Sequence, residues 1–356
     1  MTFDESLSSE RSQLSAFFDE GVRNRRMLSQ AAFQLSDIAS SKGWKFICYC
    51  RQVKAIFSNS EVHFLPKIRN FLTATAKIVG LNHSDIFRPG PTSSSPVSPE
   101  ELQIRLFGEK IEKNSEIAVV LHLFYVGLWP EIAELLSDIP EPFDLFISLP
   151  KEQKNFRSEI QKYFPNAHIY IAPNRGRDIA PFLEIFRAIF PLDYQFLCKL
   201  HSKRSTHLST GENRRQSLFS ELIGSEQRVN EILQLFRQNI EIDMVVPKGF
   251  LTGGIDIDTF TNRKNLETLA GLLNIPLHDY YFEYPAGSMF WCRPGCLEKL
   301  AGSGIRTADF PPERGQLNNT LAHAVERIFG LLVTDEGRQL IDTSVFQSYL
   351  NRKEKH

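Results

Sequence analysis

A short loop built around two arginines holds the groups that bind anionic ligands most readily. Asn174-Arg175-Gly176-Arg177-Asp178 places an amide, a glycine, two guanidiniums and a carboxylate at consecutive positions. Guanidinium groups fork onto phosphate oxygens, so the loop is typical of a site for a phosphorylated ligand. The alternative is that Asp178 only accepts backbone N–H bonds at the start of the next helix and that Arg177 is solvated.

A second basic segment begins at Lys199. Residues 199–215 hold five lysines and arginines against one acid, Glu212. If the segment starts as a strand, Lys199, His201 and Lys203 lie on one face, because side chains alternate along a strand. Three donors directed at one point suit a diphosphate, whose negative charge offsets their mutual repulsion. The alternative is a solvated loop that happens to be basic.

A third segment, 284–294, offers small residues and then aromatic ones. Gly287 and Ser288 allow a ligand to approach the backbone closely, so we expect them in an acceptor or sugar pocket. Trp291 is either a wall on which a sugar ring stacks or, as is more frequent for an aromatic residue in a strand, part of the core.

These segments need a scaffold that brings them together, and the pattern between residues 117 and 200 predicts one. Continuous apolar, β-rich runs alternate with amphipathic stretches, which indicates parallel strands joined by right-handed helical crossovers. The expected strands are 117–124, 143–149, 167–172 and 194–200, and the expected helices are 128–137, 151–163 and 178–190.

Ligands of open α/β sheets bind beyond the carboxyl ends of the strands. The loops that begin at Tyr125, Pro150, Pro173 and His201 are therefore expected to face one crevice. His122, near the end of the first strand, is either a core histidine or part of a nucleotide pocket, and we expect Tyr125 to line the same pocket.

The second half of the chain has a less regular pattern. We expect a short strand at 244–247, a flexible loop at 251–254, and helices at 262–273 and 318–329. His323 and Glu326 lie three residues apart on the last helix, a spacing found in metal sites of helical bundles. One such pair without further ligands favours structural packing.

Composition argues against several classes of protein. Lys and Arg number 41 and Asp and Glu 42, and this near balance argues against a nucleic-acid-binding protein. Five cysteines without C-x-x-C spacing predict neither a disulfide framework nor a four-cysteine zinc site. The sequence lacks a basic start followed by an apolar run and lacks any long uncharged apolar stretch, so we expect a cytoplasmic protein without a spanning helix.

A stretch rich in proline and serine, 88–99, divides the chain. We expect a helical N-terminal region at 1–87, a linker and lead-in helix at 88–113, an α/β domain at 114–335 and a tail at 336–356. Residues 42–77 interleave basic and aromatic side chains, which suits peripheral contact with an anionic membrane surface. The alternative is a solvated basic face above a small helical core.

Several motifs in the α/β region are distinctive. In chain order they read IAVVLHLFY, LWPEIAELL, PFDLFISLP, NRGRDIAPFL, CKLHSKRS, AGSMFWCRP and GQLNNTLAHAVERIFG. In these motifs the chain resembles the rhamnan synthesis protein F family of bacterial polysaccharide assembly, from about Ile117 to Leu332, with the N-terminal helices outside the resemblance. Members of that family are regarded as glycosyltransferases, chiefly rhamnosyltransferases that build cell-surface rhamnans or O-polysaccharides.

The resemblance implies transfer of a deoxyhexose from a nucleoside diphosphate donor such as dTDP-rhamnose to a growing saccharide carried on a polyprenyl lipid. Such an acceptor lies at the inner face of the plasma membrane. The strand order also resembles the nucleotide-binding half of GT-A glycosyltransferases. The expected fold class is therefore α/β, with a GT-A-like (Rossmann-like), mostly parallel sheet flanked by helices and an N-terminal helical appendage.

GT-A enzymes ordinarily carry an Asp-x-Asp metal motif at the end of the fourth strand, where this chain has Lys199-Leu200-His201. We therefore predict that no metal cofactor is required, which leaves room for a divalent metal. Basic side chains would neutralise the leaving diphosphate instead, namely Lys199, His201 and Lys203 with Arg175 or Arg177.

Inverting sugar transfer needs a carboxylate that takes the proton of the acceptor hydroxyl. Because GT-A enzymes usually carry this base late in the fold, the resemblance implies Asp309 or Glu313. Either is alternatively a helix-start carboxylate. Gln316 and Asn319 are expected to contact the acceptor, although family members tend to have Asp-Gly where this chain has Asn318-Asn319.

Two other functions stay open. A different hexose or activated group could use the same diphosphate grip, because no local motif reads the sugar's 6-position. The substituted metal motif favours a non-catalytic scaffold that binds a nucleotide sugar or a glycan within an assembly complex. The two carboxylates and the intact NRGRD loop favour an enzyme.

Overall fold

The structure of the protein is a computed structural model that describes residues 97–202, 211–253, 262–277, 282–316, 318–346 and 349. The predicted N-terminal helical region, the basic segment within it and Lys203 lie outside the described residues, so the predictions made for them stay predictions. All described residues belong to one compact unit.

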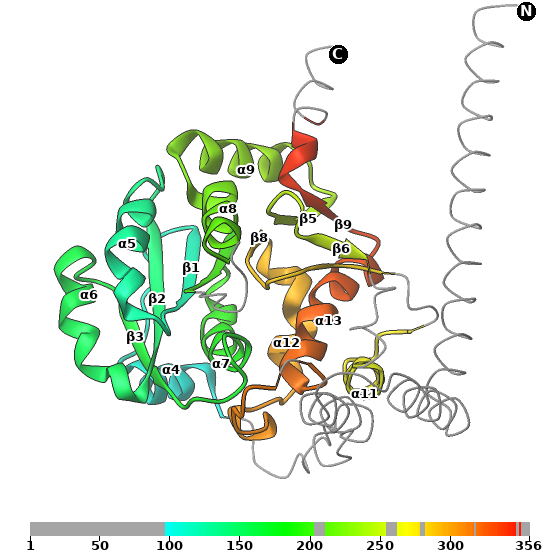
Figure 1. Ribbon diagram of the computed structural model, residues 1–356, viewed down its shortest axis with the longest axis horizontal. Coiled ribbons are helices and arrows are strands. Elements are labelled where there is room, and N and C mark those ends of the chain that lie inside the picture. Colours follow the sequence, from blue (N-terminus) through cyan, green and yellow to red (C-terminus); the bar gives the residue numbers. More distant parts are fainter. Residues whose placement is uncertain are drawn as a thin grey trace, which may run out of the picture. The chain divides into compact units, whose positions relative to one another are not determined.

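Seven strands of the described part of the chain form one sheet, in the order β3-β2-β1-β4-β8-β5-β9 (Figure 1). All run parallel except β8, which is antiparallel to both of its neighbours. Their bounds are β1 (Ile117–His122), β2 (Phe143–Pro150), β3 (His168–Ala172), β4 (Phe196–His201), β5 (Ile242–Val246), β8 (Phe290–Cys292) and β9 (Gln339–Asp342). The prediction of four parallel strands in the first half is confirmed.

Helices cover both faces of this sheet. They are α4 (Pro99–Phe107), α5 (Trp129–Ser137), α6 (Arg157–Tyr163), α7 (Ile179–Ile189), α8 (Gly211–Ile223), α9 (Glu226–Gln238), α11 (Arg263–Leu272), α12 (Glu298–Gly302) and α13 (Leu321–Asp335). Serine caps begin two of them: Ser98 Oγ accepts the Glu101 N–H of α4, and Ser225 Oγ accepts the Arg228 N–H of α9. No helix among the described residues is long and apolar enough to cross a membrane.

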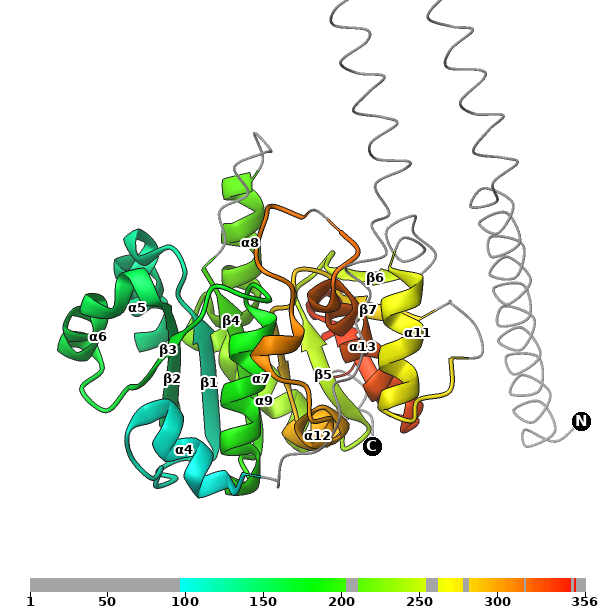
Figure 2. The same ribbon diagram turned by 90° about the horizontal axis from the view of Figure 1, so that it is seen from below.

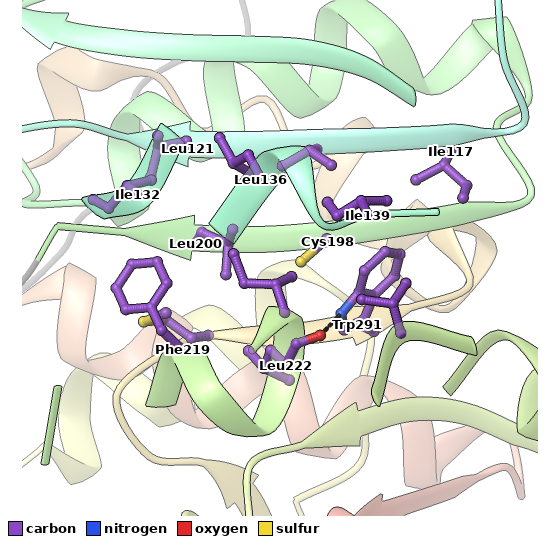
Figure 3. Close-up of a cluster of buried hydrophobic side chains, with 14 of the residues drawn as sticks. Ile117, Leu121, Ile132, Leu136, Ile139, Cys198, Leu200, Phe219, Leu222 and Trp291 are labelled. Atoms are coloured by element: carbon purple, nitrogen blue, oxygen red, sulfur yellow. Dashed lines mark hydrogen bonds between the residues drawn. The ribbon is translucent and has the colours of Figure 1, made fainter. Parts of the chain in front are cut away.

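The face of the sheet that packs on α5, α8 and α9 is apolar. Cys198 and Leu200 of β4 join the side chains of these helices in one buried cluster (Figure 3). Trp291 of β8 lies in the same cluster with 0% exposure, and its indole N–H donates to the Leu222 carbonyl at 3.0 Å. Of the two interpretations of Trp291, the core position is therefore confirmed and the sugar-stacking wall is wrong, because its ring and its polar group are both used inside the core.

The opposite face packs on α7 and α13 and carries polar groups toward its upper edge. Phe182, Phe290 and Phe329, from α7, β8 and α13, pack ring against ring. Figure 2 shows α7 lying beside β1. Strand β4 turns Lys199 to this face, with its ammonium 5.2 Å from the centre of the Phe182 ring. Alternation thus gives β4 one apolar face and one ionisable face.

The chain order creates a switch point between β1 and β4. The chain moves outward from β1 through α5 and α6 to β3, then returns through α7 to β4, which pairs with β1. His122 and His201, the last residues of β1 and β4, are partners in this pairing. Open α/β sheets bind their ligands at such a switch point, in the crevice beyond the carboxyl ends of the strands.

The structure corrects two predictions in the second half of the chain. Residues 251–253, expected as part of a flexible loop, form β6 (Leu251–Gly253), which pairs with β7 (Glu283–Pro285). Strand β7 packs tightly on α13 at Gly330, where a side chain would overlap the backbone of Glu283. Strand β9 pairs with β5, so the sheet extends beyond residue 335, where the tail was expected to begin.

Candidate functional site

A cavity of about 340 Å³ lies at the switch point, beyond the carboxyl ends of β1 and β4. Its walls come from the ends of these strands, the loop after β3, the turn between β7 and β8, the loop around residue 313 and the first turns of α13. The Tyr125 N–H donates to Ser202 Oγ at 2.8 Å and joins the two strand ends. The predicted site residues that line it are His122, Tyr125, Asn174, Arg177, Asp178, His201, Gly287, Ser288 and Glu313.

A buried ion pair, here called the floor pair, underlies this cavity. Lys199 Nζ donates to Asp178 Oδ2 at 2.5 Å and to the Ser288 carbonyl at 2.7 Å, and Ser288 Oγ donates to the same carboxylate oxygen at 2.7 Å. The side chains of Lys199 and Asp178 are 1% and 12% exposed. The prediction that Lys199 grips a diphosphate is therefore corrected, because its ammonium is enclosed and neutralised by Asp178.

Asp178 also differs from the helix cap that the sequence allowed. It occupies the position before α7, but its side chain accepts no capping hydrogen bond. Burial raises the pKa of the Asp178 carboxyl, yet the charges of His201 and Lys199 and the hydrogen bonds from Lys199 and Ser288 outweigh burial and lower it. The carboxylate therefore stays ionised at neutral pH as the counter-charge of Lys199.

His122 stays neutral beside these charges. Burial is the main reason that its pKa falls to about 4; Asp178 opposes this shift, while His201 and Lys199 add to it. Its Nδ1 is hydrogen-bonded to Ser148 Oγ at 2.8 Å. The histidine thus presents a neutral ring at the end of β1.

The turn between β7 and β8 is held in a strained conformation. Gly287 and Ser288 have φ of 90° and 48°. His201 Nε2 donates to the Gly287 carbonyl at 2.8 Å, and the Gly287 N–H donates to Glu326 Oε1 at 2.7 Å. A non-glycine residue at positive φ persists only where its surroundings enforce it. Here His201, Glu326 and the floor pair enforce the turn.

At the rim of the cavity, Arg177 and Glu313 form a second ion pair, here called the rim pair. The Arg177 N–H donates to Glu313 Oε1 at 3.2 Å, and Arg177 Nε lies 3.8 Å from Glu313 Oε2. Arg177 Nη2 also donates to the Gln316 carbonyl. The Arg177 and Glu313 side chains are 40% and 23% exposed, so both are open to exchange with solvent and ligands.

Gly176 explains how the loop after β3 reaches this rim. Its φ is 66°, and a Cβ at this position would lie 2.5 Å from the Phe310 ring. Arg175 also holds the loop against the segment around Phe310, since its Nη1 donates to the carbonyls of Ala308 and Phe310. Arg175 and Gly176 therefore position the loop and do not line the cavity, contrary to the prediction that they bind the donor.

Three other predicted residues have local roles outside the cavity wall. Asp309 accepts the Arg306 N–H at 2.7 Å and closes its own turn, so the prediction of Asp309 as the base is not supported by its position. Gln316 donates from its side chain to Pro312. Asn319, at φ 62°, offers its carbonyl to Asn265.

Sequence reasoning missed six residues that line the cavity: Phe124, Ile179, Ser202, Ala322, His323 and Glu326. The spacing of His323 and Glu326 is visible in the sequence, but it favours structural packing there. The available signal was their place in the first two turns of α13, whose N-terminus opens on the cavity. Phe124 lies edge-on to Tyr125, with ring centres 5.0 Å apart, and gives the cavity an aromatic lip.

The residues at the end of β4 do not fit a divalent cation. Lys199 and His201 occupy the strand end, and the nearby Asp178 carboxylate is already bound by the Lys199 ammonium. Within the described residues, no three His, Cys, Asp or Glu side chains are grouped so that they could hold a metal ion. The floor of the cavity instead provides histidines and a neutralised ion pair.

Comparison with known proteins gives a family and two relatives. The family model described as rhamnan synthesis protein F matches residues 51–338. This match begins well before Ile117, so the expected limit of the resemblance is corrected. The proteins named "Uncharacterized protein WxcX" from two strains of Xanthomonas campestris pv. campestris are 30% identical to this chain over 225 residues, which is 62% of this chain and 32% of each relative. The chain thus spans about a third of the length of these relatives.

Among solved structures, the one titled "Crystal structure of S. aureus TarS 1-349" aligns with a TM-score of 0.32 and 10% sequence identity. The alignment covers 60% of this chain and 54% of that chain.

Proposed function

The chain belongs to the rhamnan synthesis protein F family, and from this premise we propose that it is a glycosyltransferase of polysaccharide synthesis. In this proposal it transfers a hexosyl or deoxyhexosyl group from a nucleoside diphosphate donor, such as dTDP-rhamnose, to a growing cell-surface saccharide such as an O-antigen chain. A polyprenyl-linked acceptor at the inner membrane face would be reached from the cytoplasm by peripheral contact.

One observation carries the proposal: a cation, a histidine and a carboxylate face one cavity at the switch point of a mostly parallel sheet. They are Arg177, His201 and Glu313. Open α/β sheets bind nucleotides at this place. The order β3-β2-β1-β4 and the antiparallel β8 beside β4 support a GT-A-like assignment of the sheet.

In the proposed reaction, the donor diphosphate lies against Arg177 and His201. Glu313 takes the proton of the acceptor hydroxyl while this hydroxyl attacks the sugar carbon from the side opposite the diphosphate, which inverts the anomeric centre. The leaving diphosphate carries away the electron pair of the broken bond and is stabilised by the Arg177 guanidinium. Because the end of β4 does not fit a divalent cation, no step of the proposed reaction involves a metal.

Thermal stabilisation of the purified protein by a panel of nucleotide sugars, with and without EDTA, tests donor binding, since a ligand of the folded state raises its stability. Transfer assays then compare Glu313→Gln with the wild type. Loss of general base catalysis should lower kcat by about 10²- to 10⁴-fold. A protein that binds a nucleotide sugar but neither hydrolyses nor transfers it would favour the non-catalytic scaffold, in which the cavity holds a donor or a glycan within an assembly complex.

A further inference from the structure

In the rim pair, the Glu313 carboxylate contacts Arg177, whose guanidinium is the positive charge at the cavity wall. Both Glu313 carboxylate oxygens contact Arg177: Oε1 lies 3.2 Å from its backbone nitrogen, and Oε2 lies 3.8 Å from its Nε. A phosphate or diphosphate oxygen makes the same kind of contact with a guanidinium and a backbone N–H. The carboxylate therefore occupies the place that an anionic ligand of Arg177 would take.

The pair also joins two segments that are far apart in the sequence. Arg177 belongs to the loop after β3 and Glu313 to the loop before α13, and Arg177 Nη2 reaches the Gln316 carbonyl of that second loop as well. Release of Glu313 would leave the guanidinium tied to the loop by this carbonyl bond. Arg177 thus has one ionic contact that a ligand can replace, with Glu313, and one hydrogen bond to a neutral carbonyl, that of Gln316.

We propose that Glu313 is an internal competitor of the donor's diphosphate, and that donor binding displaces Glu313 from Arg177 and frees its carboxylate for the acceptor. The inference rests on the proposed function, and it adds an order of binding, donor before acceptor. In the absence of donor, the base is bound to Arg177. After exchange of partners, the positive charge of Arg177 lies on the leaving group and the carboxylate is available to accept a proton.

Exchange of this kind needs a pair that is weak enough to open. The floor pair is enclosed, whereas both members of the rim pair are partly exposed to water. Coulomb attraction between partly solvated charges is screened, so Glu313 competes only weakly with a ligand for Arg177. A diphosphate carries more negative charge than one carboxylate and offers several oxygens, so it displaces Glu313 from Arg177.

The test measures binding of dTDP, UDP and GDP to the wild type and to Glu313→Gln by isothermal titration calorimetry. The glutamine keeps an oxygen that accepts the Arg177 N–H, but it removes the charge. If Glu313 competes with the ligand, Glu313→Gln binds the preferred nucleoside diphosphate about two- to five-fold more tightly than the wild type.

Asp309→Asn is the matched control. Asp309 lies four positions earlier in the same loop, accepts a backbone N–H of Arg306 and does not line the cavity. The change alters net charge by the same amount as Glu313→Gln and should leave the affinity unchanged. In an Arg177→Gln background, adding Glu313→Gln should give no gain, because the guanidinium for which the two anions compete is absent.

The outcomes separate the inference from the function on which it rests. Tighter binding by Glu313→Gln alone, lost in the Arg177→Gln background, supports the competition. A wild type that binds the nucleotide, with Glu313→Gln equal or weaker, overturns the competition and leaves the donor site intact. A folded wild type and folded variants, checked by thermal melting, that bind none of the three nucleotides overturn both the donor site and the competition.

Discussion

Two ion pairs border the same cavity, and they differ in almost every physical respect. The floor pair, Lys199 with Asp178, is enclosed, short at 2.5 Å and tied to Ser288. The rim pair, Arg177 with Glu313, is partly exposed, and its closest charged atoms lie 3.8 Å apart. A buried pair can lose a partner only at a high energetic cost, whereas an exposed pair can exchange partners. The floor pair therefore shapes the cavity, and the rim pair is the one that can exchange partners.

Removal of one cation from each pair should give the largest contrast in stability. Lys199→Met leaves the Asp178 carboxylate buried without its counter-charge and should lower the free energy of unfolding by about 3–5 kcal/mol. Arg177→Met removes a screened surface pair and should cost no more than about 1 kcal/mol. Urea denaturation followed by circular dichroism measures both. Equal losses would show that the two pairs do not differ as their burial implies.

The acid limit of stability should come from the floor of the cavity. His122 has a pKa of about 4 in the folded protein, below its ordinary 6.5, so the unfolded chain binds the proton first. The contribution of His122 to the free energy of unfolding should be fully present above about pH 6.5. This free energy should fall by roughly 3 kcal/mol as the pH drops toward 4. Asp178, whose pKa is also lowered, adds a further loss only below its ordinary range.

Unfolding midpoints measured between pH 7 and pH 4 test this expectation. His122→Asn should flatten the decrease between pH 6.5 and pH 4 and leave the steeper loss at lower pH. An unchanged slope in this variant would move the origin of the acid limit away from the end of β1.

Donor affinity should depend on the rim. Arg177→Ala removes the guanidinium that hydrogen-bonds the ligand's diphosphate in the proposed site. It should weaken nucleoside diphosphate binding by about ten- to hundred-fold. Arg314→Ala, an exposed arginine in the neighbouring loop that does not line the cavity, is the control and should bind as the wild type does. Calorimetric titration of both variants decides whether the effect belongs to Arg177 or to local positive charge in general.

The smallest effect is expected at Asp309. Asp309→Asn keeps an oxygen that accepts the Arg306 N–H, so stability should change by no more than about 0.5 kcal/mol. Turnover should match the wild type, in contrast to Glu313→Gln. A large loss of kcat in Asp309→Asn with normal donor binding would return Asp309 to the choice of base.

The amino-acid sequence by itself determined the first four strands, their parallel direction and the meeting of their carboxyl ends. Apolar periodicity is local and crossovers have a fixed hand, so β1 to β4 and the loops at Tyr125, Pro173 and His201 follow from nearby residues. Shared orientation of Lys199 and His201 also follows, because side chains alternate along a strand.

Only the tertiary structure decided which charges reach the cavity. Asp178 meets Ser288 across 110 positions of the chain, and Arg177 meets Glu313 across 136. These partners bury Lys199 and leave Arg177 partly exposed, although both are basic residues in basic segments of the sequence. Packing likewise placed Trp291 in the core and turned His323 and Glu326 of α13 toward the cavity. Burial and pairing between distant segments set the role of a charged side chain, and residue order alone does not encode them locally.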